Sequence, residues 1–128
     1  MTLVDSSALY ALVSATDAHH QEAAGALRKL ARSGDLLTHN YVVLETTAIV
    51  DKRQGRAAVR DLHERILAPI AITWIDERIH AAAVSALLVS RGPSFVDLVS
   101  FEVMRRLRID RAFAFDRDFA EHGFEVVP

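Results

Sequence analysis

The sequence contains no cysteine among its 128 residues. This absence excludes disulfide bonds, thiolate metal sites and a thiol nucleophile, and it is compatible with the cytoplasmic location that we expect. An excess of one charge is also missing, because the net charge is only −2. No bulk positive field therefore attracts nucleic acid, and any contact with a polyanion must depend on a local group of arginines.

Long hydrophobic runs are absent as well. No apolar stretch approaches the roughly 20 residues that cross a bilayer, so no membrane association is expected. Asp5 interrupts the N-terminus where a secretory signal would need a cationic start and a longer apolar segment. The sequence also lacks internal repeats and linkers, while 51% of its residues are hydrophobic. This composition and length predict a single domain with its own core, covering residues 1–128.

Strands and helices alternate along the predicted chain. The predicted strands cover residues 2–4, 35–39, 70–75, 111–115 and 124–127. The predicted helices cover residues 6–14, 19–34, 40–53, 55–67, 76–92 and 94–109, with a helical turn at 116–123. We expect Asn40 to cap its helix and Trp74 to pack within the fold. Short apolar strands between helices predict a three-layer α/β/α fold around a small, mostly parallel sheet of four to five strands.

Two aspartates follow predicted strands directly. Asp5 comes after the first strand and Asp116 after the fourth. In a parallel sheet, ligands bind beyond the carboxyl ends of the strands, so both side chains are candidates for one shared site. The alternative is that each caps the helical segment that follows it. Asp97 has the same ambiguity, because it lies three residues after Ser94 in a capping-box pattern.

Glu45 is harder to explain as a structural residue. Its spacing from Val42 and Ile49 places it on the apolar stripe of its predicted helix. An unpaired buried carboxylate costs several kcal/mol or takes up a proton. A salt bridge to an arginine is one solution, and a cation shared with other carboxylates is another. Oxygen ligands without cysteine suit Mg²⁺ or Mn²⁺ better than Zn²⁺.

Three segments together resemble a known family. The segments LVDSSALYAL, VVLETTAI and SFVDLVSFEVMRRLRIDRAFAFDRDF, with a length near 130, are similar to the PIN-domain ribonucleases, above all to the VapC toxins of bacterial toxin–antitoxin pairs. The resemblance covers essentially the whole chain and implies a PIN-like fold. It identifies an acidic quartet of Asp5, Glu45, Asp97 and Asp116.

The resemblance also implies roles within the site. Asp5 and Asp97 would be the most direct metal ligands, and Glu45 and Asp116 would complete the site or hold metal-bound water. Ser7 matches a small polar position that would hydrogen-bond a ligand carboxylate. Asp118 matches a less constant acidic position, for which a surface or capping role is the alternative. Phe115 departs from the family, which often has serine or threonine before the fourth aspartate.

The activity that the resemblance implies is metal-dependent endonucleolytic hydrolysis of RNA with Mg²⁺ or Mn²⁺, which leaves 5′-phosphate and 3′-hydroxyl ends. Arg53, Arg91 and Arg105 are candidates for contacts with the RNA backbone, although each also suits a solvated surface. The expected partners are a VapB-like antitoxin, whose C-terminal segment would wrap the groove, and a second copy of the chain. The alanine-rich stretch at Ala81–Ala86 would suit close packing of such a homodimer, and a buried core helix is the equal alternative.

Three alternatives stay open on the sequence alone. The first is an RNA-processing PIN nuclease that is not a toxin, and the second is a phosphatase on the same fold. The third is a catalytically silent PIN-like binding scaffold, which the presence of all four acids disfavours. The sequence does not specify which RNA or bond is cut, or how many metal ions are bound.

Overall fold

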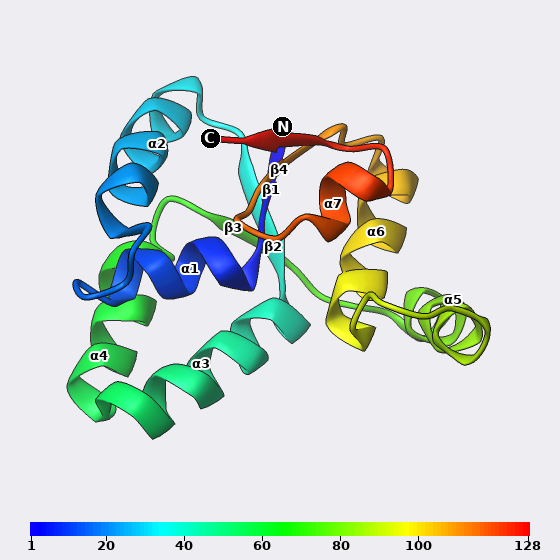
Figure 1. The fold of residues 1–128 in the computed structure, drawn as a ribbon, viewed down its shortest axis with the longest axis horizontal. Coiled ribbons are helices and arrows are strands. Elements are labelled where there is room, and N and C mark those ends of the chain that lie inside the picture. The colour runs from blue at the N-terminus through cyan, green and yellow to red at the C-terminus, as the bar shows by residue number, and fades with distance from the viewer.

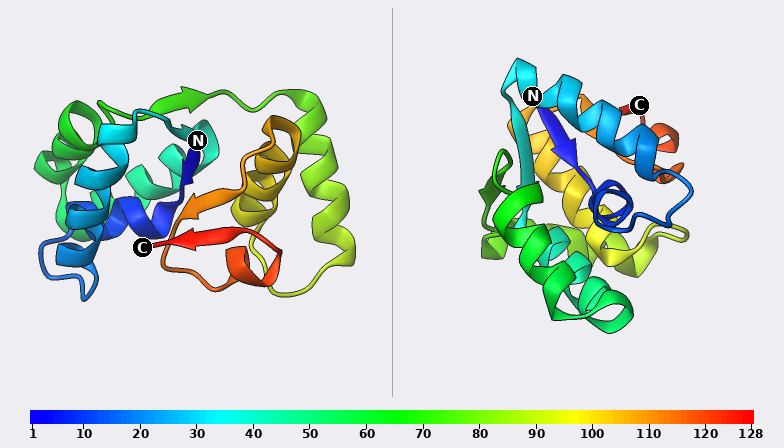
Figure 2. Two further views of the ribbon diagram at one scale, coloured as in Figure 1. Left: turned by 90° about the horizontal axis from the view of Figure 1, so that it is seen from above. Right: turned by 90° about the vertical axis from the view of Figure 1, so that its left-hand side faces the viewer.

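A five-stranded sheet runs through the centre of the molecule. A computed structural model describes residues 1–128. All four strand pairs are parallel, and the strand order is β3-β2-β1-β4-β5, so β3 and β5 form the two edges (Figures 1 and 2). The strands are β1 (Thr2–Val4), β2 (Leu36–His39), β3 (Ala71–Thr73), β4 (Arg111–Phe113) and β5 (Glu125–Val127).

Helices connect the strands and cover both faces of the sheet. They are α1 (Ser6–Val13), α2 (His20–Ser33), α3 (Asn40–Gln54), α4 (Arg56–Asp61), a π-helical turn η1 (Leu62–Ile66), α5 (Glu77–Val89), α6 (Phe95–Leu107) and α7 (Asp118–Glu121). None of these helices has the length and apolar character required to cross a membrane.

The side chains of the central strands divide the core into two parts. Val4 and Phe113, which are paired across β1 and β4, pack with α1, α2 and η1 on one face. Leu3 and Ala112 form the preceding pair of the same two strands, and they pack with α5, α6 and α7 on the other face. Neighbouring side chains on a strand point to opposite faces, so apolar strands need cover on both sides. The predicted three-layer α/β/α fold is confirmed, with helices on both sides of the sheet (Figure 1). The sheet is entirely parallel.

Two local predictions are wrong. His39, not Asn40, caps α3, because the His39 side chain accepts a hydrogen bond from the Val42 amide. Asn40 Oδ1 instead accepts from the Ile75 amide at 2.8 Å and fastens the chain after β3. Trp74 does not pack in the core and is 74% exposed. It follows β3, a three-residue edge strand whose outer side has no neighbouring strand to cover it.

Candidate active site

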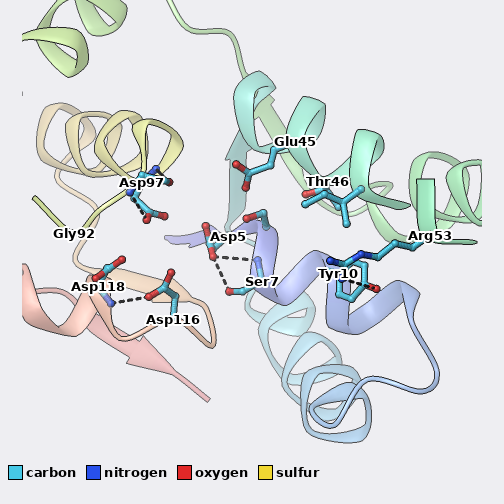
Figure 3. Close-up of a pocket in the computed structure, with 13 residues that line it drawn as sticks. Asp5, Ser7, Tyr10, Glu45, Thr46, Arg53, Gly92, Asp97, Asp116 and Asp118 are labelled. Carbon is cyan, nitrogen blue, oxygen red and sulfur yellow. Dashed lines mark hydrogen bonds between the residues drawn. The ribbon is translucent and has the colours of Figure 1, made fainter. Parts of the chain in front are cut away.

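A cavity of about 550 Å³ opens beyond the carboxyl ends of β1 and β4 (Figure 3). The parallel pairing of these adjacent strands brings Asp5, which follows β1, close to Asp116, which follows β4. The N-terminus of α6 adds Asp97 to the wall, α3 adds Glu45, and α7 adds Asp118. All four acids singled out in the sequence therefore line one cavity, together with a fifth.

Three of these aspartates form the tightest group. Asp97, Asp116 and Asp118 each offer a carboxylate oxygen, and these oxygens lie within 4.8 Å of one another. The Asp118 amide donates to Asp116 Oδ1 at 2.9 Å, which fixes the short turn before α7. Asp118 was expected at a less constant position with a surface role as the alternative, but its side chain lines the cavity. Carboxylates this close repel one another unless a proton or a cation lies between them.

Asp5 is the most deeply buried of the acids, at 2% exposure. Its Oδ2 accepts from the Ser7 hydroxyl at 2.6 Å and from the Ser7 amide at 3.1 Å, so Asp5 also caps α1. Its Oδ1 is buried with no hydrogen-bond partner in the protein. Burial raises the pKa of Asp5, and the nearby Asp116 carboxylate raises it further. An ionised oxygen in this position fits a bound cation.

Asp97 combines a structural bond with a place in the cavity. It forms the predicted capping box, because Ser94 Oγ accepts from the Asp97 amide and Asp97 Oδ2 accepts from the Ser94 amide, both at 3.1 Å. Burial, followed by repulsion from Asp5 and Asp116, raises the pKa of Asp97 to about 6. The capping and site positions are compatible, because the capping bond uses only one of the two carboxylate oxygens.

Glu45 occupies a different position from the one predicted. The buried stripe of α3 consists of Val42, Thr46 and Val50, whereas Ile49 is 37% exposed. Glu45 lies beside this stripe, half-buried at the cavity wall, and forms no salt bridge. The expectation that Glu45 lies within the apolar stripe is therefore wrong, but its side chain reaches the same cavity as the aspartates (Figure 3).

The cavity has a second part away from the aspartates. Its walls are Tyr10 from α1 and Thr46, Ile49 and Arg53 from α3 (Figure 3). Of these, only Arg53 was singled out in the sequence. The other residues could have been found from their closeness in the sequence to the predicted acids. Tyr10 lies five residues after Asp5, and Thr46 directly follows Glu45.

The other two candidate arginines do not line the cavity. Arg105 is exposed on α6 and lies 3.6 Å from Glu102. Arg91 is exposed beside Gly92, which does line the cavity. Among the three arginines selected from the sequence, Arg53 alone faces the site directly.

Comparison with known proteins now identifies the fold family. The family model described as PIN domain matches residues 2–125. The chain belongs to the PIN-domain family. It is 37% identical over 134 aligned residues to the 23S rRNA-specific endonuclease VapC20 of Mycobacterium tuberculosis, in strains H37Rv and CDC 1551, and the match covers 100% of this chain and 99% of that protein.

A solved structure supports the same assignment. The crystal structure of M. tuberculosis VapC20, described as a sarcin–ricin loop cleaving toxin, superimposes with a TM-score of 0.86 and 33% identity and covers 100% of both chains. The predicted resemblance to VapC-type PIN domains is confirmed.

Ser7 links the two strand ends of this PIN domain. Its hydroxyl donates to Asp5 Oδ2 and accepts from the Phe115 amide at 3.0 Å, so one side chain holds the segments after β1 and β4 together. Phe115 thus contributes its backbone amide to the site.

If Asp5 binds a metal ion, we expect Ser7→Ala to reduce RNA cleavage by about 10- to 100-fold, because Ser7 orients the Asp5 carboxylate. We also expect a loss of about 1–3 kcal/mol of unfolding free energy, because the Phe115 amide loses its acceptor. Activity assays and chemical denaturation measure the two effects. Ser33→Ala, which removes an exposed hydroxyl from the end of α2, is the matched control. Equal activity of the two variants would contradict this role.

A buried histidine joins the Glu45 helix to the Asp97 helix. His39 Nδ1 accepts from the Val42 amide at 3.3 Å, so the ring proton lies on Nε2, which donates to Ser100 Oγ on α6 at 2.8 Å. Burial lowers the pKa of His39 to about 4. The neutral ring therefore joins the start of α3, which carries Glu45, to α6, which carries Asp97.

This buried histidine predicts a loss of stability in acid. The folded-state pKa lies below the unfolded value of 6.5, so the unfolded chain binds the proton first as the pH falls from 6.5 to 4. Stability that is fully present above pH 6.5 should decline through this window by about 3 kcal/mol for this residue. Denaturation of His39→Gln at several pH values should show a correspondingly weaker pH dependence. His63→Gln, at an exposed position, should retain the wild-type dependence.

Proposed function

We propose that this PIN domain is a divalent-metal-dependent endoribonuclease of the VapC type. The observation that carries the proposal is the gathering of five carboxylates in one cavity, with a buried Asp5 oxygen that has no partner in the protein. Such a concentration of negative charge would repel RNA by itself, so a cation is required for binding as well as for reaction.

The donor set fits Mg²⁺ or Mn²⁺, which prefer carboxylate oxygens. Asp5 and Asp97 are the proposed direct ligands, and Asp116, Glu45 and Asp118 complete the acidic set. When bound, such an ion supplies Lewis-acid activation of the phosphoryl group and lowers the pKa of water. Ser7 keeps Asp5 oriented through its hydroxyl, and the capping box keeps Asp97 in place.

Arginines at the edge of the acidic set are the proposed contacts with the RNA backbone. Arg53 lines the cavity, and Arg91 lies next to its wall at Gly92. Arg105, farther along α6, is proposed as an outer contact. Because these residues bind phosphates and not bases, their removal should weaken binding to RNA of any sequence to a similar degree.

The proposed substrate is the sarcin–ricin loop of 23S rRNA, which is cut by the full-length relative described above. We also propose a cytoplasmic location, because a protein that cuts 23S rRNA needs access to ribosomes. We further propose a VapB-like antitoxin as partner, with a basic side chain of its C-terminal segment entering the acidic cavity. Cleavage should then stop on addition of the protein encoded by an adjacent small reading frame.

The test uses purified protein, a synthetic RNA hairpin carrying the sarcin–ricin loop, and a hairpin with a scrambled loop. We expect cleavage of the first hairpin with Mg²⁺ or Mn²⁺, 5′-phosphate ends, and no cleavage in EDTA. Hydrolysis of small phosphate esters with intact RNA would favour the phosphatase. Binding of RNA without hydrolysis of any of these substrates would favour the silent scaffold.

A homodimer is the proposed assembly. Exposed apolar side chains surround a groove of about 470 Å³ between α3 and the β3 edge, among them Leu44 at 69% and Trp74 at 74% exposure. Apolar surface of this kind is typical of interfaces between proteins. Sedimentation analysis should show a dimer that Leu44→Glu dissociates. Leu88→Glu, at an equally exposed position on α5, is the matched control, and the dimer should resist it if the groove is the interface.

A further inference from the structure

The second part of the cavity differs in chemistry from the acidic part. We call it the Tyr10–Arg53 lobe, formed by Tyr10, Thr46, Ile49 and Arg53. It combines an aromatic ring, an exposed aliphatic side chain, a hydroxyl and a cation, and it contains no carboxylate of its own (Figure 3). A metal site alone gives no reason for this combination.

Arg53 and Tyr10 hold each other in place. The guanidinium carbon lies 5.6 Å from the centre of the Tyr10 ring, and Nη1 donates to the Tyr10 hydroxyl at 3.5 Å. Arg53 forms no salt bridge, so no carboxylate neutralises its charge. A guanidinium in this position remains available to an incoming phosphate, and the ring remains available to a base.

Thr46 supplies an independent observation. It is 1% exposed, and its Oγ1 is buried without a hydrogen-bond partner, yet the residue lines the cavity at the end of the lobe next to Glu45. Buried hydroxyls in folded proteins are almost always paired. A polar group that enters the cavity from outside would satisfy this hydroxyl.

Building on the proposed function, we infer that the Tyr10–Arg53 lobe binds one unpaired ribonucleotide next to the bond that is cut. Tyr10 and Ile49 pack against the base, Thr46 Oγ1 hydrogen-bonds the ribose 2′-hydroxyl, and Arg53 binds the adjoining phosphate. Stacking on an aromatic ring and contact with the 2′-hydroxyl are the usual means by which proteins recognise single-stranded RNA.

The phosphate that Arg53 binds is not the scissile phosphate, because Arg53 lies too far along α3 from the acids. Arg53 lies eight residues after Glu45, which is about 12 Å along the helix axis. The guanidinium is held over Tyr10, on the far side of Thr46 from the acids (Figure 3). It therefore contacts a neighbouring phosphate. The base must leave its helix to stack on Tyr10, so the substrate must be unpaired at this nucleotide.

The first experiment changes only the RNA. Each loop nucleotide of the cleaved sarcin–ricin hairpin is replaced in turn by its 2′-deoxy or its abasic form, and KM and kcat are measured with wild-type protein and Mn²⁺. At one nucleotide flanking the cut, we expect the 2′-deoxy change to raise KM by about 2- to 13-fold, the effect of one hydrogen bond. At the same nucleotide, the abasic change should raise KM by about 5- to 150-fold.

The second experiment couples the RNA to the protein. Thr46→Val should raise KM for normal RNA. With this variant, KM should be the same for the normal hairpin and for the hairpin with the 2′-deoxy change at that nucleotide. Tyr10→Leu should lose the penalty for the abasic form, whereas Tyr10→Phe, which keeps the ring, should retain it. Arg53→Gln should reduce the slope of log KM against log salt by about one. The changes in these variants should be larger in KM than in kcat, because the lobe is proposed to act in ground-state binding.

The two proposals fail in different ways. If wild-type protein cuts no RNA with Mg²⁺ or Mn²⁺, the proposed nuclease is wrong. If it cuts the hairpin but no nucleotide flanking the cut raises KM in its 2′-deoxy or abasic form, the Tyr10–Arg53 lobe does not bind a ribonucleotide. The RNA substitutions use unmodified protein, so this second outcome does not depend on the folding of any variant.

Discussion

Asp97→Asn should reduce RNA cleavage by about 10²–10³-fold and at the same time stabilise the metal-free protein at neutral pH. The first effect follows from loss of a charged ligand at the centre of the proposed site, comparable to removal of a group that stabilises transition-state charge. The second follows from burial and from repulsion by Asp5 and Asp116, which raise the pKa of Asp97. Asparagine keeps an acceptor for the Ser94 amide, so the capping box survives.

The pH dependence of the stability difference has a defined sign. The folded-state pKa of about 6 exceeds the unfolded value of 3.8, so between these values the folded protein holds a proton that the unfolded chain has lost. The stability of metal-free wild type should fall as the pH rises through this window. Asp97→Asn lacks this cost and should gain about 1–2 kcal/mol over wild type by pH 7, since solvent screens part of the full shift.

Denaturation in EDTA from pH 4 to 7 measures the stability effect, and hairpin cleavage with Mn²⁺ measures the activity. Glu102→Gln is the matched control, because it removes one carboxylate from the same helix outside the cavity. It should leave both properties near wild type. An Asp97→Asn protein with full activity would remove Asp97 from the proposed metal ligands.

The sequence predicts the position of an acid where the acid directly follows a strand or begins a helix. Asp5 and Asp116 each follow a strand, and parallel neighbours must place such residues at the same edge of the sheet. Asp97 was recognisable through its capping box, which fixes the residue at the start of a helix. These features are local, so sequence spacing determines them.

Features that depend on contacts between distant segments were not predictable in this way. The periodicity of α3 suggested that Glu45 is part of the apolar stripe, because Ala48 and Ile49 are apolar, but the neighbouring elements leave these two residues exposed. The pairing of Tyr10 with Arg53 joins residues 43 positions apart on different helices. The His39 ring caps α3 and also bonds Ser100 on α6, whereas the Asn40 side chain bonds the Ile75 amide. Both contacts with distant residues lie outside the local pattern that suggested Asn40 as the cap.

The second large effect concerns Asp118. One of its carboxylate oxygens lies within 4.8 Å of oxygens of Asp97 and Asp116, whereas the sequence left a surface role open. If this group binds the cation, Mn²⁺ at 100 times its dissociation constant should stabilise wild type by about 2.7 kcal/mol. Asp118→Asn should then require about 10- to 100-fold more Mn²⁺ for the same stabilisation.

Thermal unfolding at increasing Mn²⁺ concentrations gives this result without any assay of RNA cleavage. Glu121→Gln is the matched control, because it removes an exposed carboxylate from the same short helix outside the cavity. Without metal, Asp118→Asn should be at least as stable as wild type, because one repulsive charge is gone from the group. The two properties should therefore move in opposite directions. If Asp118→Asn raised the metal-free stability but left the Mn²⁺ response unchanged, Asp118 would lie near the cation without binding it. A surface aspartate would change neither the metal-free stability nor the Mn²⁺ response.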